Sequence, residues 1–232
     1  MGILFDKDGT LLDFEATYGT ACANIVHELA EGDEECAARL AEAAGFDLSA
    51  RRFSDDSIII AGSAMTLADL WAPFLGVAAS PDLARRFDDM FAHHSSGSVM
   101  VFDGVGNVLG DLAARGLPLG IATNDSEEGG RAHAEIAGIS GHFSFYAGHD
   151  SGHGAKPDPG MVLAFAGHCE CPPERIVMVG DSLHDMHAAR AAGAIGVAVT
   201  TGPAGREQLA PHADYVIDNL AELTGLPPLS GY

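Results

Sequence analysis

Residues 1–12 read MGILFDKDGTLL, and this stretch decides how the rest of the chain is interpreted. The apolar run at residues 3–5 predicts a short buried strand that delivers one carboxylate, Asp6, to its own end, and a second, Asp8, follows two residues later. In strand geometry the two would share a face, and at the end of a parallel strand that face borders a ligand crevice. Two close carboxylates repel each other unless a cation or a shared proton lies between them. The pair therefore predicts a bound metal and a reacting oxyanion.

The next two residues, Gly9 and Thr10, predict a tight turn with exposed backbone N–H groups, which suits phosphate binding. Lys7 lies between the two acids, and strand alternation would point it to the face opposite both of them. We therefore expect Lys7 to be structural.

Composition limits the partners that this protein can have. The chain of 232 residues is 47% hydrophobic, with 12 basic and 33 acidic residues, for a formal net charge of −21. Such a surface repels nucleic acids and anionic membranes, so we expect neither as a partner. An anionic substrate then needs a local cation and positioned hydrogen-bond donors.

Cysteine usage and hydropathy indicate a cytoplasmic protein. Four cysteines are too few for a disulfide framework at this length, and without a second cysteine pair Cys169 and Cys171 are better read as free thiols than as a metal site. The first expected strand starts at residue 2, which leaves no room for a signal peptide, and no apolar run reaches membrane-spanning length.

Residues 14–96 have the pattern of a small all-helical unit. The first helix shows an amphipathic stripe formed by Tyr18, Cys22, Ile25, Val26 and Leu29. Further helices are expected at residues 34–44, from a capping-box-like start at Thr66, and from Ser80, which precedes Pro81. The polar stretch at 93–98 is a suitable boundary.

From residue 105 onward, helices alternate with short apolar runs. Strands are expected at residues 119–122, 143–147, 176–179, 195–199 and 215–217. This alternation predicts an α/β fold: a Rossmann-like parallel sheet with helices on both faces. The expected domains are a catalytic core of residues 1–13 and 97–232 and an inserted helical cap of residues 14–96. An insertion at that point would act as a lid over the strand ends.

Two further groups are candidates for binding a phosphoryl group. Thr123 and Asn124 end the expected strand at 119–122, where a hydroxyl and an amide can donate hydrogen bonds without adding charge. Lys156 is one of only two lysines in the chain, and beside the carboxylates it would keep Asp6 ionised and neutralise an incoming phosphate. Taken alone, the Thr-Asn pair is better explained as an ordinary loop pair and Lys156 as a surface lysine before a helix.

A second buried run, residues 176–179, leads through Gly180 to Asp181, and Asp185 follows one helical turn later. Mg²⁺ prefers oxygen ligands, so we expect it to be bound by Asp6, Asp181 and the Asp8 segment. Asp185 would act through water or hold Lys156. Asp181 could instead simply cap the following helix.

In this order the four pieces resemble the motifs of the haloacid-dehalogenase-like (HAD) hydrolase superfamily. The match covers residues 2–13 and 98–217, and the FDGV string at 102–105 resembles the segment that rejoins cap to core in phosphoglycolate-phosphatase-like members. The resemblance implies a Mg²⁺-dependent phosphatase acting on a small phosphorylated metabolite. Asp6 would form an aspartyl-phosphate, Asp8 would act as acid and base, and Lys156, Thr123, Asn124 and the turn at Gly9 and Thr10 would bind the phosphate.

Several alternatives share this scaffold. Dehalogenases typically lack an acid at position 8, and phosphonatases need a cap lysine, which residues 14–96 do not contain. A sugar phosphomutase remains open, as does a non-catalytic phosphate-binding regulatory protein. Asp13 is followed by Phe14 rather than a small hydroxyl residue, which departs from phosphoglycolate-type members. The oligomeric state, monomer or homodimer, is left undecided.

Overall fold

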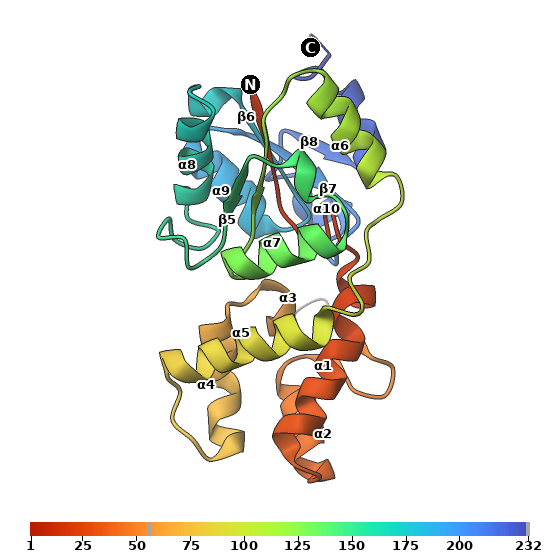
Figure 1. The fold of residues 1–232 in the computed structure, drawn as a ribbon, viewed down its shortest axis with the longest axis vertical. Coiled ribbons are helices and arrows are strands. Elements are labelled where there is room, and N and C mark those ends of the chain that lie inside the picture. The colour runs from red at the N-terminus through yellow and green to blue at the C-terminus, as the bar shows by residue number, and fades with distance from the viewer. Residues whose placement is uncertain (55–56, 231–232) are drawn as a thin grey trace. The chain divides into compact units, whose positions relative to one another are not determined.

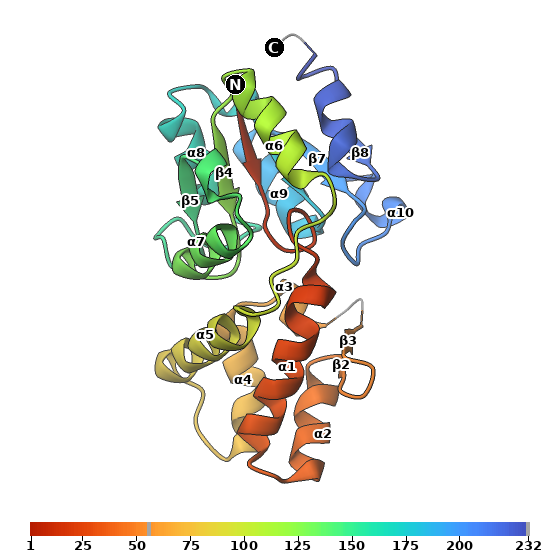
Figure 2. The ribbon, with the colours of Figure 1, turned by 45° about the vertical axis from the view of Figure 1, so that its right-hand side comes forward.

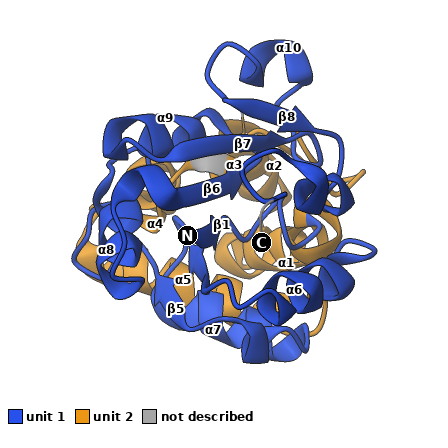
Figure 3. Cartoon of the chain, turned by 90° about the horizontal axis from the view of Figure 1, so that it is seen from above, with its two compact units in different colours: residues 1–13, 101–232 blue, residues 14–100 orange. Residues whose placement is uncertain are grey.

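The structure is a computed structural model and describes residues 1–54 and 57–230. The chain forms two compact units, residues 1–13 with 101–232, and residues 14–100 (Figure 3). Residues 55–56 of the predicted cap and 231–232 of the predicted core lie outside the described part. The second junction falls after Met100, whereas we predicted it after residue 96. Residues 98–100 stay with the helical unit because Ser98 Oγ donates to the Thr17 carbonyl (2.7 Å) and Met100 N donates to Thr17 Oγ1 (3.1 Å).

The first unit is built on a parallel sheet of six described strands in the order β5-β4-β1-β6-β7-β8. The strands are β1 (Gly2–Phe5), β4 (Leu119–Ala122), β5 (Phe145–Ala147), β6 (Ile176–Gly180), β7 (Ile195–Val199) and β8 (Tyr215–Ile217). Every residue of β1, β4 and β6 is buried, as expected of parallel strands covered on both faces. The predicted α/β fold is confirmed.

Helices lie on both faces of this sheet, as Figures 1 and 2 show. Helices α8 and α9 pack together on one face, and α6 and the 3₁₀ helix η3 pack on the other. The elements are α6 (Val105–Ala114), α7 (Glu127–Ile136), η1 (Ser140–His142), α8 (Gly160–His168), η2 (Pro173–Arg175), α9 (Leu183–Ala192), α10 (Arg206–Leu209) and η3 (Leu220–Gly225). Among the described residues, no helix combines the length and apolar character that a membrane crossing requires.

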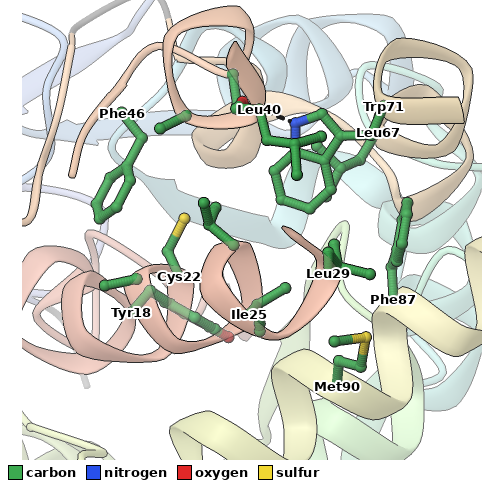
Figure 4. Packing of buried hydrophobic residues seen from close by; sticks show 14 of the residues in the cluster. Tyr18, Cys22, Ile25, Leu29, Leu40, Phe46, Leu67, Trp71, Phe87 and Met90 are labelled. Carbon is green, nitrogen blue, oxygen red and sulfur yellow. Dashed lines mark hydrogen bonds between the residues drawn. The ribbon is translucent and has the colours of Figure 1, made fainter. Parts of the chain in front are cut away.

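The second unit is a helical bundle with its own apolar core (Figure 4). It contains α1 (Phe14–Ala30), α2 (Glu34–Ala43), β2 (Phe46–Asp47), β3 (Arg52–Phe53), α3 (Ile58–Ala61), α4 (Ala64–Leu75) and α5 (Pro81–Ser95). The predicted stripe of α1 is buried in full: Tyr18, Cys22, Ile25, Val26 and Leu29. Trp71 is fully buried at the centre, where its Nε1 donates to the Leu40 carbonyl at 3.0 Å.

Two local expectations for this unit were wrong. Helix α4 is capped by Ser63, whose hydroxyl accepts from Thr66 N, so Thr66 lies inside the first turn instead of starting it. The unit is also not purely helical, because Phe46 and Phe53 pair in a short antiparallel ribbon with ring centroids 4.8 Å apart. The Ser80 cap before Pro81 is confirmed, with the Ser80 hydroxyl accepting from Leu83 N.

Candidate active site

The candidate site lies where the three central strands end. β1 pairs with β4 on one side and with β6 on the other, with Phe5 opposite both Ile121 and Val179. Residues that follow these three strands therefore emerge at one edge of the sheet, at the point where the strand order reverses. They are Asp6 after β1, Thr123 after β4 and Asp181 after β6.

The Lys156 ammonium connects the segment after β1 with the segment after β6 through two ion pairs. Its Nζ donates to Asp6 Oδ1 at 2.6 Å and to Asp185 Oδ1 at 2.7 Å, and the whole residue is only 4% exposed. Burial alone would lower the pKa of Lys156, but the charges of Asp185 and Asp6 outweigh it and raise the pKa above its usual range. The ammonium is thus held in its charged form between two carboxylates.

The carboxylates nevertheless outnumber this cation. Oxygens of Asp6, Asp181 and Asp185 lie within 4.8 Å of one another, and all three residues are buried. Burial, with the neighbouring acids adding to it, raises the pKa of Asp6 to about 7 and that of Asp181 well above its usual range. Lys156 alone therefore does not keep Asp6 fully ionised, contrary to the expectation from the sequence. Three acids that resist ionisation beside a single ammonium need a further positive charge to become carboxylates, and Mg²⁺ prefers hard oxygen donors, so the residues present fit a divalent cation.

The backbone leaves little freedom to the Asp181 carboxylate. Thr10 Oγ1 donates to Asp181 Oδ1 at 3.2 Å. A Cβ at Gly9, which has φ +74°, would come 2.3 Å from Asp181 Oδ2, and a Cβ at Gly202 would come 1.7 Å from the same atom. Only glycines at these two positions leave room for the carboxylate as it lies.

Asp185 is held by its own helix start as well as by Lys156. Its Oδ2 accepts from Ser182 Oγ at 2.6 Å and from Ser182 N at 3.1 Å, which completes a capping box on α9. Both oxygens of Asp185 are therefore engaged, and the residue is placed to orient Lys156. Asp181 is not the helix cap: Ser182 has that role.

Asp8 lies apart from the carboxylate cluster. Its Oδ2 is 2.8 Å from Lys7 Nζ, and its Oδ1 is a buried oxygen with no hydrogen-bond partner among the described residues. The expectation that Lys7 points away from both aspartates was wrong for Asp8. The regular strand ends at Phe5, so side-chain alternation does not extend to residues 7 and 8. That Asp8 ligates the metal stays a prediction.

The remaining predicted residues also lie at this edge. The amide of Asn124 brackets the backbone of Lys156, accepting from its N at 2.8 Å and donating to its carbonyl at 3.0 Å. Thr123 is buried, and its hydroxyl accepts from Asp125 N at 3.1 Å. In the structure Asn124 thus positions Lys156, and its role in phosphate binding stays a prediction.

One segment of the site was missed by the sequence analysis. Thr201 follows β7, and its Oγ1 donates to the Gly9 carbonyl at 2.6 Å, fixing the turn after β1. Gly202 is next in the chain and lies against Asp181. The signal was present, because a hydroxyl and a glycine follow an expected strand there, the same kind of pattern that singled out Thr123.

Residues 1–193 match the haloacid dehalogenase-like hydrolase family. The chain belongs to this family. A phosphoglycolate phosphatase of Chromobacterium violaceum is 37% identical over 142 residues, covering 61% of this chain and 63% of that protein. The chain spans between 48% and 63% of the length of this and other curated phosphoglycolate phosphatases that it matches.

Two solved structures place the chain within the HAD fold. One is a HAD phosphatase of Thermococcus onnurineus (TM-score 0.68, 23% identity, covering 97% of this chain and 96% of that one). The other is a Thermotoga maritima protein assigned as a beta-phosphoglucomutase (TM-score 0.68, 19% identity, covering 100% and 98%). The equal scores mean that fold similarity does not separate a phosphatase from a mutase here.

Proposed function

We propose that this HAD family member is a Mg²⁺-dependent phosphatase that hydrolyses a small-metabolite phosphate monoester through a phosphorylated Asp6. The observation that carries the proposal is the contact between the Asp6 carboxylate and the Lys156 ammonium, 2.6 Å apart, beside the carboxylates of Asp181 and Asp185. A buried nucleophile next to a fixed cation and a cation-binding acid cluster suits phosphoryl transfer, which depends mainly on positioning and charge stabilisation.

In the first half-reaction an oxygen of Asp6 attacks phosphorus as the bond to the leaving alcohol breaks. Asp6, Asp181 and the Asp8 segment would hold Mg²⁺, which when bound lowers the repulsion between the carboxylates and the phosphate. Lys156 neutralises the phosphoryl oxygens, and Asn124 keeps its backbone in place. Thr123 and the backbone N–H groups around Gly9 and Thr10 would donate hydrogen bonds to the same oxygens.

Asp8 is assigned the proton transfers. Its protonated carboxyl donates to the leaving alkoxide oxygen, and the resulting carboxylate then takes a proton from the water that attacks the aspartyl-phosphate. Its buried Oδ1, which has no hydrogen-bond partner among the described residues, supports this assignment. The second step returns Asp6 as a free carboxylate and releases inorganic phosphate.

For the substrate we propose a small acid phosphate of the phosphoglycolate type. The support is the 37% identity to a phosphoglycolate phosphatase over 142 residues. The runner-up is a sugar phosphomutase, favoured by the fold similarity to the Thermotoga protein. A non-catalytic phosphate-binding regulator is the third candidate, but Asp6, Asp8, Lys156 and Asp181 are all retained, which favours an enzyme. The four free cysteines favour a reducing compartment, and we assign the reaction to the cytoplasm.

The deciding experiment measures phosphate release from two-carbon acid phosphates, hexose phosphates and 4-nitrophenyl phosphate, with Mg²⁺ and with EDTA. A phosphatase releases phosphate only with Mg²⁺, whereas isomerisation of a hexose phosphate without phosphate release would favour the mutase. Borohydride treatment of the quenched reaction should convert phosphorylated Asp6 to homoserine, which mass spectrometry detects. Stabilisation by Mg²⁺ and a phosphate mimic without turnover of any substrate would favour the regulator.

A further inference from the structure

Lys7 is a buried cation whose role the proposed mechanism does not yet include. It lies between Asp6 and Asp8, is only 1% exposed, and is the only lysine besides Lys156 in the chain. Burial of an ammonium is costly unless it is paired and hydrogen-bonded. The groups that contact the Lys7 ammonium therefore indicate its role.

Three acceptors from three segments surround the Lys7 ammonium. Asp8 Oδ2 lies 2.8 Å from Nζ, Asp125 Oδ2 lies 3.0 Å from it, and His133 Nδ1 also lies 3.0 Å from it. Asp125 follows β4, and His133 is buried on α7. A lysine ammonium has three N–H donors, so its geometry matches three acceptors held on separate elements.

The charge states of the supporting residues agree with this arrangement. Burial would raise the pKa of Asp125, but the Lys7 charge and hydrogen bond outweigh it and keep the pKa below its usual range. Burial and the Lys7 charge both lower the pKa of His133. The ammonium thus meets one carboxylate and one neutral imidazole as well as Asp8, and His133 Nδ1 acts as an acceptor.

Asp8 receives a defined orientation from this contact. Its Oδ2 is anchored on Lys7, while its Oδ1 has no hydrogen-bond partner among the described residues and is buried. A buried polar atom without a partner is unusual in a folded protein and is a place where a ligand group can bind. Oδ2 of Asp8 is therefore fixed, and Oδ1 is available for proton transfer.

We propose that Lys7, held in turn by Asp125 and His133, is a positioning residue that fixes the Asp8 carboxyl so that Oδ1 exchanges protons with the leaving oxygen and then with water. This inference rests on the proposed phosphatase function. The Oδ1–H proton passes to the alcohol oxygen as its bond to phosphorus breaks, and Oδ1 takes one proton from water as the new oxygen–phosphorus bond forms. Lys7 itself exchanges no proton and touches no substrate. A small displacement of Asp8 is costly because such steps depend on near-ideal geometry.

The proposal predicts a dependence on the leaving group that a merely structural Lys7 would not produce. An alkyl phosphate has a poor leaving group that needs the proton from Asp8, whereas 4-nitrophenyl phosphate has a good one that needs it far less. The ratio kcat/KM includes only the steps up to alcohol release, so it isolates this first proton transfer. We compare kcat/KM for glycerol phosphate or phosphoglycolate with that for 4-nitrophenyl phosphate.

The test variant is Lys7→Met, which keeps the length of the side chain and removes its charge. We expect kcat/KM for the alkyl substrate to fall at least about tenfold more than for 4-nitrophenyl phosphate. The milder Asp125→Asn, which keeps an acceptor oxygen, should shift the ratio in the same direction by less. Thermal unfolding shows whether Lys7→Met folds. If it does not, Asp125→Asn still tests the proposal. The matched control is Arg131→Met, which removes an exposed cation from the same helix as His133.

A double-mutant cycle tests whether Lys7 acts through Asp8. If Lys7 acts through Asp8, adding Lys7→Met to Asp8→Asn should leave the residual kcat/KM unchanged within about twofold, since the residue it positions has lost its acid function. Equal losses on both substrates, no loss, or additive effects in the double variant would overturn the inference. A wild-type protein that hydrolyses neither substrate with Mg²⁺ would instead overturn the proposed function and this inference with it.

Discussion

Lys156 and Asp6 are 150 residues apart in the sequence, yet Nζ of the first lies 2.6 Å from Oδ1 of the second. Both are buried, and Asp185 Oδ1 lies on the same ammonium at 2.7 Å. A carboxylate in this setting cannot rotate freely, so the lysine holds one oxygen, and under the proposed function the other oxygen attacks phosphorus. The contact joins the loop after β5 to the end of β1.

Under the proposed function, loss of the Asp6 carboxylate should abolish turnover. We expect Asp6→Asn to reduce Mg²⁺-dependent phosphate release by about a thousandfold or more, because an amide cannot form the aspartyl-phosphate that the proposed mechanism requires. Steady-state release from phosphoglycolate and from 4-nitrophenyl phosphate measures this. Thermal unfolding in EDTA is the control for folding. Retention of Mg²⁺-dependent activity would show that Asp6 is not the nucleophile.

Removal of the buried ammonium should destabilise the protein. Lys156→Met leaves Asp6 and Asp185 without their shared cation, and breaking a buried ion pair in this way typically costs about 3–5 kcal/mol of unfolding free energy. Urea unfolding in EDTA measures the change. Arg131→Met removes an exposed cation that pairs with Glu127 and lies over the Tyr146 ring, and it should cost less than about 1 kcal/mol. Equal losses of unfolding free energy in the two variants would contradict the stabilising role of Lys156 between Asp6 and Asp185.

The metal-free protein should lose stability as the pH rises from about 4 to about 7. The pKa of Asp6 is about 7 in the folded state against 3.8 as its ordinary value, so the folded state keeps a proton that the unfolded chain has released. The contribution of Asp6 to the unfolding free energy then falls by up to about 1.4 kcal/mol per pH unit across this window. The measurement is urea unfolding in EDTA at about pH 5 and about pH 7.5, for the wild type and Asp6→Asn. Between these two pH values the wild type should lose more stability than Asp6→Asn. A smaller loss in the wild type than in the variant would refute the prediction.

A methyl group at Gly202 should weaken metal binding without preventing folding. Its Cβ would lie 1.7 Å from Asp181 Oδ2, so in Gly202→Ala the carboxylate has to move. We expect the apparent affinity for Mg²⁺ to fall about tenfold or more, as judged by calorimetric titration. Gly205→Ala is the matched control, since its Cβ would meet nothing within 4 Å. An unchanged affinity in Gly202→Ala would mean that Asp181 is not a ligand.

The single tryptophan provides a separate probe of residues 14–100. Trp71 is fully buried there and donates to the Leu40 carbonyl. Its fluorescence should therefore follow the unfolding of this unit alone. Trp71→Phe should lower the stability of the unit by about 1–3 kcal/mol, because the buried ring becomes smaller and the Leu40 carbonyl keeps only one of its two donors, Ala44 N. Circular dichroism melting of wild type and variant measures this; an unchanged melt would contradict it.

The positions of Asp6, Thr123 and Asp181 at one edge could be foreseen from the sequence. Each follows a short buried run, and parallel strands send the residues after them to the same edge of a sheet. Lys156 was assigned to this edge from motif order, because the loop that carries it has no periodic pattern of its own.

The surroundings of Asp8 could not be foreseen in the same way. They depend on where β1 stops being regular and on contacts with Asp125 and His133, which lie more than a hundred residues further along the chain. The Ser63 cap and the Phe46–Phe53 ribbon were missed for a similar reason. Several local hydrogen-bonding patterns compete there, and tertiary packing decides among them.

The central place of β1 has a consequence for biosynthesis. This strand leaves the ribosome before both of its neighbours, β4 and β6, which are translated only after residues 14–100. The contiguous helical segment has its own apolar core and can fold while β1 is still unpaired. We therefore expect cotranslational folding in two stages, with the sheet closing late and chaperones engaging the early strand in between.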